Sequence, residues 1–587
     1  MGCGFSQDGQ VQQLYQFRKL PSAQDNFEIP ERPENRRKTD RKYLVAFIVV
    51  LIVLIPFLVY TLMYTDLRTL SGTDNCGNFC GYKNKKYDEW ACTGKDYTDQ
   101  KYQYLEGYVT INDVLRIRKR ECVTSCPVGY EPTFHTCIRK SNTVIRNNEQ
   151  YDESNLTMED FIALLGNIGR DIRHGWWAIV LSAIASCLLC FGTMSLFRYA
   201  VDFVVWFILI GSVGILAIIA GLFWYAYFKM KDSQPIDGKQ VKDGASGFMV
   251  LAVIFSIIVL CLIIVITCMV KRVKLIIQLF KEASKSIFDI PSLIMMPVWT
   301  SMLVTIVFLI FIILTVFMAF AGKLTEVAST PSGLYLEYMQ NSVMTIALVY
   351  NIFAYIWVTE FIIGAQYMII AGAVSAWFFT RNKQYLDAPL WTAFTNFTRF
   401  HMGTVAIGSL VITIMTIVRG LIRSLCENEK TKWIIECCMS NIEEFLRFLS
   451  KNAYIQTAMH GQPFFKSGKR AAKLLVSNAA NVIAVNSIGD FVLVIAQLLL
   501  IVVSSVVGVF IAKATQTEHY WAIAVICVFI ACCMAGTFFA IFEATIDCIF
   551  ICFCEDTTLN DGMARPFFMS KGLMQFIEDS KAIYPKK

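Results

Sequence analysis

The chain alternates between long apolar runs and shorter polar segments that carry most of its charged residues. A run of about 20 apolar residues is long enough to cross the ~30 Å hydrocarbon core of a bilayer as a helix. Nine runs meet this length, at residues 44–64, 176–196, 201–228, 248–270, 298–321, 343–379, 401–422, 488–512 and 520–547. The pattern predicts an all-α, polytopic membrane protein, with most of the chain forming one helical unit.

A tenth span is expected at 432–449, although this segment contains Glu436, Glu443 and Glu444. Nine spans would leave the C-terminus on the opposite side of the membrane from the N-terminus. A tenth span places the basic segment 451–487 in the cytosol, where an excess of Lys and Arg is typical. We therefore expect about ten transmembrane helices with both termini in the cytosol.

Basic residues set the expected orientation and domain boundaries. Six of them lie between residues 32 and 42, and an excess of Lys and Arg beside the first span marks the cytosolic side. The expected parts are a cytosolic arm 1–43, a first span 44–64, an extracellular loop 65–174, a transmembrane bundle 175–549 with cytosolic segments 271–297, 380–400 and 451–487, and a cytosolic tail 550–587.

Two polar segments on the cytosolic side show their own patterns. Residues 7–40 contain proline and lack apolar periodicity, so we expect them to have no fixed structure. In 271–285, apolar residues alternate with lysines at helical spacing, which predicts an amphipathic helix on the membrane surface. The chain begins MGCGFS, which fits myristoylation at Gly2 and palmitoylation at Cys3, although so short a pattern also arises by chance.

The outer loop contains six cysteines and one glycosylation sequence. An even number of cysteines in an oxidising compartment predicts three disulfides, among fifteen possible pairings. A zinc site is the less favoured alternative, because the loop is expected outside the cell. Asn155 opens an Asn-Leu-Thr acceptor for glycosylation. The six cysteines are Cys76, Cys80, Cys92, Cys122, Cys126 and Cys137.

The span at 343–379 contains a single carboxylate, Glu360, and no Lys or Arg. An ionisable group at membrane depth costs roughly 2.5 kcal/mol or more, so it is functional by default. Aromatic residues share its helical stripe, and ring faces attract organic cations. The pattern predicts a cation site, and the alternative is a structural glutamate bonded to a neighbouring helix. The candidate substrate-binding residues are Tyr350, Phe353, Trp357, Glu360, Gln366 and Tyr367.

This span is also longer than a bilayer requires. Its 37 residues would extend ~55 Å as a straight helix, so we expect it to tilt, break or extend into one of the aqueous phases, with Gly364 and Gly372 as hinges. In the last span, Glu543 and Asp547 lie one turn apart on one face and are candidates for a proton relay. Asp490 begins the preceding span and is expected to be a helix-end residue.

Several function classes lack support in the sequence. We find no Gly-rich phosphate loop, no GxSxG motif and no histidine at metal-ligand spacing, so we expect no enzyme, no cofactor and no metal. The net charge of +7 comes from basic residues clustered at span ends, so no nucleic-acid partner is expected. A channel is a weaker alternative, because no ring of charge or repeated filter element is visible.

Five segments carry a resemblance to a known family. They are TDNCGNFCG (73–81), TEFIIGAQYMIIAGAVSAWFF (359–379), KNAYIQTAMHG (451–461), SIGDFVL (487–493) and EDTTLNDGMARPFFMS (555–570). They resemble the choline transporter-like protein family, the eukaryotic solute carriers for choline and related amines. Lys451 stands where the family motif has Arg.

The resemblance implies a ten-span transporter with a glycosylated outer loop. It further implies carriage of choline, or in some members ethanolamine, across plasma or mitochondrial membranes, without sodium and by facilitated transport or proton exchange. We expect a small cationic amine and the lipid bilayer as partners. The expected location is the plasma membrane, and a mitochondrial or other organelle membrane is the alternative. A monomer would suffice, and the sequence leaves the oligomeric state open. The competing hypothesis is a non-transporting membrane protein whose Cys-rich outer loop binds a partner.

Overall fold

The computed structural model describes most of the chain. The predicted lipidation residues Gly2 and Cys3 and the glycosylation acceptor Asn155 lie outside the described residues, so they stay predictions. The described ranges are 29–111, 115–133, 135–139, 158–232, 240–330, 333–426, 429–516, 520–561 and 565–575.

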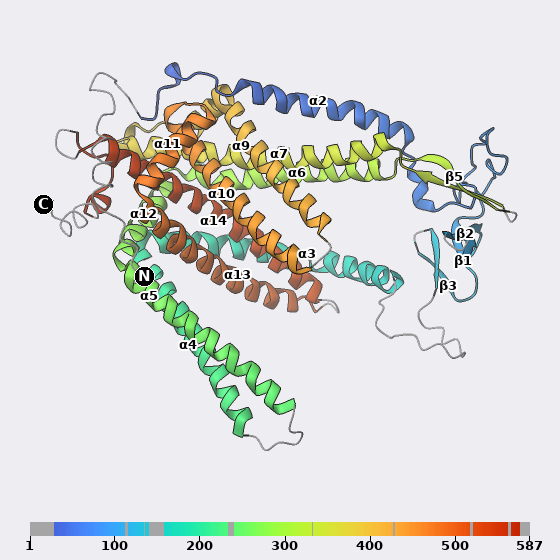
Figure 1. Cartoon of the computed structure of the whole chain (residues 1–587), viewed down its shortest axis with the longest axis horizontal. Coiled ribbons are helices and arrows are strands. Elements are labelled where there is room, and N and C mark those ends of the chain that lie inside the picture. Colours follow the sequence, from blue (N-terminus) through green and yellow to red (C-terminus); the bar gives the residue numbers. More distant parts are fainter. Residues whose placement is uncertain are drawn as a thin grey trace.

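Helices dominate these ranges, and nine helical segments within them are long and apolar enough to cross a membrane (Figure 1). The prediction of a polytopic helical membrane protein is confirmed. The helices that form these segments are α2 (Arg41–Tyr64), α3 (Met158–Tyr199), α4 (Val201–Asp232), α5 (Gln240–Asp289), α6 (Met295–Ala319), α7 (Ser342–Phe379), α9 (Met402–Leu425), α13 (Asp490–Lys513) and α14 (Tyr520–Leu559).

Shorter elements connect or extend these helices. Two are π-turns, η5 and η6, which directly precede α9 and α13. The short elements are η1 (Pro33–Asn35), η2 (Leu67–Ser71), η3 (Pro291–Ile294), η4 (Lys383–Tyr385), α8 (Pro389–Asn396), η5 (Phe397–His401), α11 (Phe464–Ser477), α12 (Ala479–Ala484) and η6 (Val485–Gly489).

The outer loop folds around a four-stranded sheet of order β2-β1-β4-β3. All six predicted cysteines form disulfides, Cys76–Cys92, Cys80–Cys122 and Cys126–Cys137, which leaves none of them as a zinc ligand. A hairpin of β5 and β6 between α6 and α7 adjoins this loop, since Leu336 N–H donates to the carbonyl of Asn75. The strands are β1 (Tyr102–Ile111), β2 (Leu115–Val123), β3 (Tyr130–Thr133), β4 (Thr136–Arg139), β5 (Lys323–Thr330) and β6 (Gly333–Met339).

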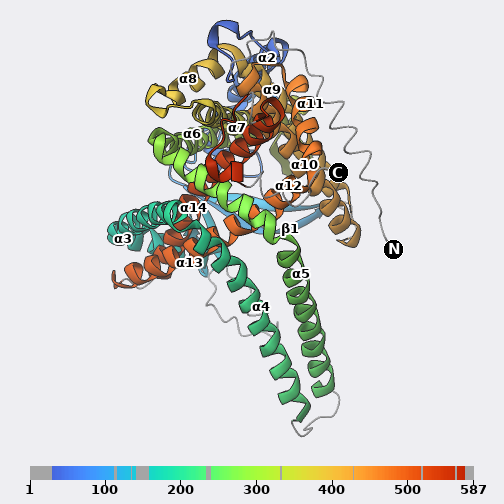
Figure 2. The same cartoon turned by 90° about the vertical axis from the view of Figure 1, so that its left-hand side faces the viewer.

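Helix α3 begins at Met158, well before the expected start of the second span at residue 176. The last part of the predicted outer loop is therefore helical and continues directly into the span. Helices α4 and α5 pack against each other as a hairpin, and Figure 2 shows this hairpin leaving the bundle at an angle. Apolar residues cover its exposed faces, as expected for contact with lipid.

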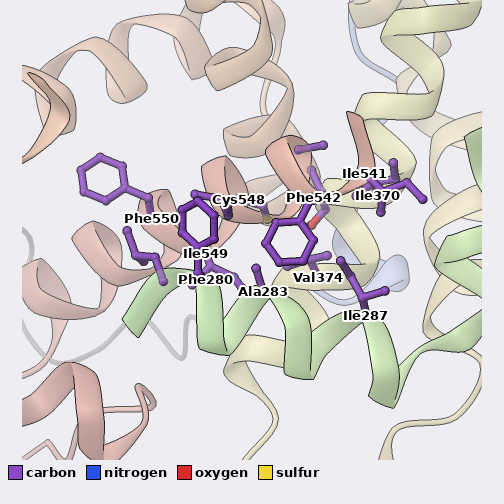
Figure 3. Packing of buried hydrophobic residues seen from close by; sticks show 14 of the residues in the cluster. Phe280, Ala283, Ile287, Ile370, Val374, Ile541, Phe542, Cys548, Ile549 and Phe550 are labelled. Carbon is purple, nitrogen blue, oxygen red and sulfur yellow. The ribbon is translucent and has the colours of Figure 1, made fainter. Parts of the chain in front are cut away.

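The predicted amphipathic helix at 271–285 is part of α5, and its apolar stripe packs on other helices. The apolar residues Phe280, Ala283 and, just beyond this segment, Ile287 are fully buried against α7 and α14 (Figure 3). The spacing correctly predicted an amphipathic helix. The apolar stripe packs on Phe542 and its neighbours, and a position at the cytosolic membrane surface stays a prediction.

The end of the N-terminal arm has a defined structure, contrary to expectation. Arg36 Nη2 donates to the carbonyl of Ala458 at 2.7 Å, and Thr39 N–H donates to the carbonyl of Phe400 at 2.9 Å. Polar side chains spaced along an apparently featureless stretch thus cap the ends of α10 and η5. The prediction of disorder was wrong for 29–40, because these partners come from distant sequence.

Helix α7 runs unbroken through both predicted hinge glycines. A Cβ atom on Gly364 would lie 3.0 Å from Val405 Cγ1, and one on Gly372 would lie 2.9 Å from Ala393 Cβ. Small residues let membrane helices approach closely, which explains both glycines in this conformation. The predicted break is wrong here, and a hinge role during movement stays a prediction.

Helix α10 (Glu429–His460) contains the segment expected as the tenth span. It packs along α7, α9 and α11, although none of its residues 431–442 is buried. It is too polar to be among the nine apolar segments. Its position beside two apolar spans requires that its charged residues find partners.

Candidate functional site

One face of α10 pairs its charges with residues of α7 and α9. Arg447 on α10 binds Glu360 on α7 through two hydrogen bonds, Nη1–Oε2 at 2.9 Å and Nη2–Oε1 at 2.7 Å. Arg447 also donates to Glu443 at 3.0 Å. Arg419 on α9 donates to Glu443 at 3.0 Å and to Glu436 at 2.9 Å. We call these five residues the arginine seam; it combines three carboxylates with two guanidinium groups.

A second group lies one turn further along α10. Lys451 Nζ lies 2.6 Å from Glu543 Oε1 on α14 and 5.6 Å from the centroid of the Tyr367 ring on α7. Tyr367 donates its hydroxyl hydrogen to Asp547 at 2.7 Å. Asp490, at the start of α13, interacts electrostatically with Glu543, Asp547 and Lys451. We call these five residues the carboxylate cluster; it combines three carboxylates with one ammonium group.

Local sequence explains how four helices place the cluster residues together. Glu543 and Asp547 are four residues apart, so they project from one face of α14. Lys451 follows Arg447 by four residues on α10 and therefore continues the same face. The π-turn η6 ends at Gly489, immediately before Asp490. Such turns are frequent at functional sites, because the extra residue redirects the side chains that follow.

The predicted site residue Glu360 is therefore well paired in space. It was the only charge in its apolar run, yet two hydrogen bonds join it to Arg447. Bidentate pairing between guanidinium and carboxylate is strong and directional. The structure thus matches the alternative considered for this residue, a glutamate bonded to a neighbouring helix. A direct role in substrate binding stays a prediction.

Three of the predicted aromatic residues, Tyr350, Phe353 and Trp357, contact α2, α9 or each other. Trp357 is buried and donates its indole N–H to Ala406 O and Ser409 Oγ on α9, both at 3.2 Å. Its ring also packs against Phe353 at 5.6 Å between centroids. Tyr350 donates its hydroxyl hydrogen to a backbone carbonyl of α2. These rings join α7 to α2 and α9.

Of the predicted substrate-binding residues, only Tyr367 belongs to the carboxylate cluster. Gln366, next to it on α7, is partly buried. The structure brings Tyr367 together with the relay candidates Glu543 and Asp547, which the sequence had assigned to a separate role. A proton relay through these two acids stays a prediction.

Sequence reasoning missed Lys451, which it had assigned to the cytosolic segment 451–487. The residue lies inside α10 and faces the α14 span. Two signals were available: Lys451 opens the segment KNAYIQTAMHG, and it extends a helical stripe with Glu443 and Arg447 at spacings of four. Within the described ranges, no group of three potential metal ligands occurs, and the cluster's own chemistry suits an organic cation.

Comparisons with known proteins extend over most of the chain. A family model described as plasma-membrane choline transporter matches residues 253–558, which is more than half of the chain. Choline transporter-like protein 1 of Xenopus laevis is 28% identical over 88% of both chains. Choline transporter-like protein 2 of Dictyostelium discoideum is 25% identical over 87% of this chain and 90% of its own. Choline transporter-like protein 3 of Homo sapiens is 25% identical over 88% of this chain and 87% of its own.

Proposed function

Since the chain belongs to the plasma-membrane choline transporter family, we propose that it carries choline or a related amine, such as ethanolamine, across a membrane. The carboxylate cluster is the observation that supports a cationic substrate most directly. Among the described residues it gathers three acids from two helices around one ammonium and the ring of Tyr367. We place the substrate's charged group at this cluster.

The chemistry of a quaternary ammonium fits such a cluster. The ion has no N–H to donate, so it is held by negative charge and by ring faces. Each ring contributes ~0.5–2 kcal/mol, with the larger values in desolvated sites. In the structure, the ammonium of Lys451 occupies a position between the carboxylate of Glu543 and the ring of Tyr367. That position is suited to a positive charge.

We assign the arginine seam a different role. Its carboxylates already have guanidinium partners, so a substrate cation would have to displace a bidentate pair. Removing one partner from a fully buried ion pair leaves an uncompensated charge at a cost of about 3–5 kcal/mol, which is an upper bound for this partly buried pair. We therefore propose that Glu360 holds α7 against α10 and allows α10 to cross the membrane as the tenth span. Tyr350, Phe353 and Trp357 support it by packing α7 against α2 and α9.

The proposed transport is independent of sodium and takes place at the plasma membrane. In the simplest form it is facilitative, with the membrane potential drawing the cation inward. Exchange against protons is the alternative form, and Glu543 and Asp547 are the residues that would carry the proton.

The test is uptake of radiolabelled choline into proteoliposomes that contain the purified chain. We expect uptake by the unaltered protein, and a loss of roughly tenfold or more in Asp547→Asn, because an acid that would neutralise the cation is removed. Glu337→Gln, at an exposed position on β6, is the matched control and should leave uptake unchanged.

Competition by choline analogues in the same assay tests whether the site recognises the positive charge of the substrate or only its shape. Tetramethylammonium should compete with choline, whereas its uncharged analogue 3,3-dimethyl-1-butanol should not. Equal competition by both compounds, or full uptake by Asp547→Asn, would reject the cluster as the cation site. No uptake by the unaltered protein would reject the transport function.

A further inference from the structure

Lys451 and Arg447, one turn apart on α10, differ in the number of hydrogen bonds that they make to carboxylates. Its ammonium contacts Glu543 through one hydrogen bond of 2.6 Å, and its side chain is 37% exposed. Arg447, one turn away, is held by two carboxylates at once. Arg447 therefore makes four hydrogen bonds to two carboxylates, whereas Lys451 makes a single one, to Glu543.

We propose that Lys451 is an internal counter-cation, which occupies the substrate's position in the empty transporter and leaves it when the substrate binds. The proposal rests on the cation transport proposed above. In the empty state the ammonium of Lys451 lies on Glu543 beside the Tyr367 ring. When choline arrives, its ammonium takes this place, and the flexible four-carbon stem of Lys451 carries the displaced charge away from the ring.

The physical reason is the return of the empty carrier. A facilitative transporter must reorient its site once without substrate in every cycle. Carboxylates left without a cation at membrane depth are costly, so an empty acidic site would raise the barrier to this step. A tethered ammonium neutralises Glu543 during the return. The cycle then needs no sodium ion or proton to fill the empty site.

The charge balance agrees with this role. The cluster contains three carboxylates, Asp490, Glu543 and Asp547, so one ammonium does not neutralise it. When choline binds while Lys451 stays nearby, two positive charges face three negative charges if all three acids are ionised, and two if one of them holds a proton. The cluster can therefore accept a second cation without acquiring net positive charge. The arginine seam, with three carboxylates and two guanidinium groups, has already reached this balance.

The proposal predicts a split between two kinds of transport. In Lys451→Gln, exchange of labelled for unlabelled choline needs only the loaded site, so it should continue within about twofold of the unaltered protein. Net uptake into choline-free liposomes needs the empty return, so it should fall roughly tenfold or more. The double variant Lys451→Gln/Glu543→Gln removes one charge of each sign and should recover part of the net uptake.

The experiment measures exchange and net uptake side by side in proteoliposomes, with Lys469→Gln as the control at an exposed lysine of α11. Loss of net uptake with retained exchange supports the counter-cation. A parallel loss of both activities, or no change in either, overturns it, because a purely structural lysine would not separate them. Absence of exchange in the unaltered protein would instead reject the proposed transport function, and this inference with it.

Discussion

Two neighbouring regions of α10 use the same kinds of residue in opposite ways. In the arginine seam, Glu360 and Glu443 are held by guanidinium groups through several hydrogen bonds each. In the carboxylate cluster, one turn along the helix, Glu543 has a single ammonium contact and Asp547 a tyrosine hydroxyl. The first region is close to neutral and geometrically fixed. The second is acidic and adjustable.

The difference shows that a charge that stands alone in an apolar stretch of sequence can still be paired in the structure. Glu360 is the only carboxylate in an apolar run without Lys or Arg, yet two hydrogen bonds join it to Arg447. Glu543 and Asp547 are less conspicuous because they lie near the end of their span. Their partners leave part of their charge uncompensated, which is the property that a cation site requires.

The largest effect is expected from breaking the seam. Arg447→Met leaves Glu360 and Glu443 without a shared partner. Since the pair is only partly buried, the loss of stability should stay below the ~3–5 kcal/mol of a fully buried pair and should be seen as a lower melting temperature in detergent. Glu360→Gln/Arg447→Met removes both charges of the main pair and should restore most of the loss. A melting temperature in Arg447→Met equal to that of the unaltered protein would show that the seam does not hold α10.

A smaller and more selective effect is expected from the aromatic residues. Tyr367→Leu removes the ring beside Lys451 and should raise the KM for choline roughly 2- to 30-fold, which corresponds to ~0.5–2 kcal/mol. Trp357→Leu removes a ring that packs on α2 and α9, so it should lower the melting temperature more than it changes KM. Measuring KM and melting temperature in both variants decides whether Tyr367 or Trp357 contacts the substrate. A large change of KM in Trp357→Leu and none in Tyr367→Leu would favour Trp357.

The smallest effect is expected at the glycines of α7. Gly364→Ala places a methyl group 3.0 Å from Val405 Cγ1, so we expect a stability loss of about 1 kcal/mol. Gly420→Ala on α9 meets no atom within 4 Å and should cause no loss. A large fall in transport rate in Gly364→Ala at unchanged melting temperature would contradict close packing as the glycine's role and favour a hinge.

Much of the fold was predictable, because apolar run length and cysteine number are local properties. The nine apolar segments and the three disulfides follow from such counts. The pairing of Cys80 with Cys122 could not be predicted, since it depends on how distant segments meet. The same limit explains the arm at 29–40, where Arg36 finds its partner in α10.

The site was predictable only in part, for a physical reason. Hydropathy assigns a free-energy cost to each charge in isolation, so Lys451 looked cytosolic and Glu360 looked exceptional. The true free-energy cost depends on partners from other helices. With those partners in place, Glu360 is paired with Arg447, and Lys451 lies among acids of the last two spans. Tyr367, Glu543 and Asp547 were each singled out, but one sequence does not show that α7 and α14 bring them together.

The central claim is that the substrate's charge is held by the carboxylate cluster and not by Glu360. Equilibrium binding of radiolabelled choline to the purified protein tests it directly, with Asp547→Asn compared against the charge-balanced variant Glu360→Gln/Arg447→Gln. The account predicts that binding weakens roughly tenfold or more in Asp547→Asn and stays within about threefold in the paired variant. Retained binding in Asp547→Asn together with its loss in the paired variant would contradict the account.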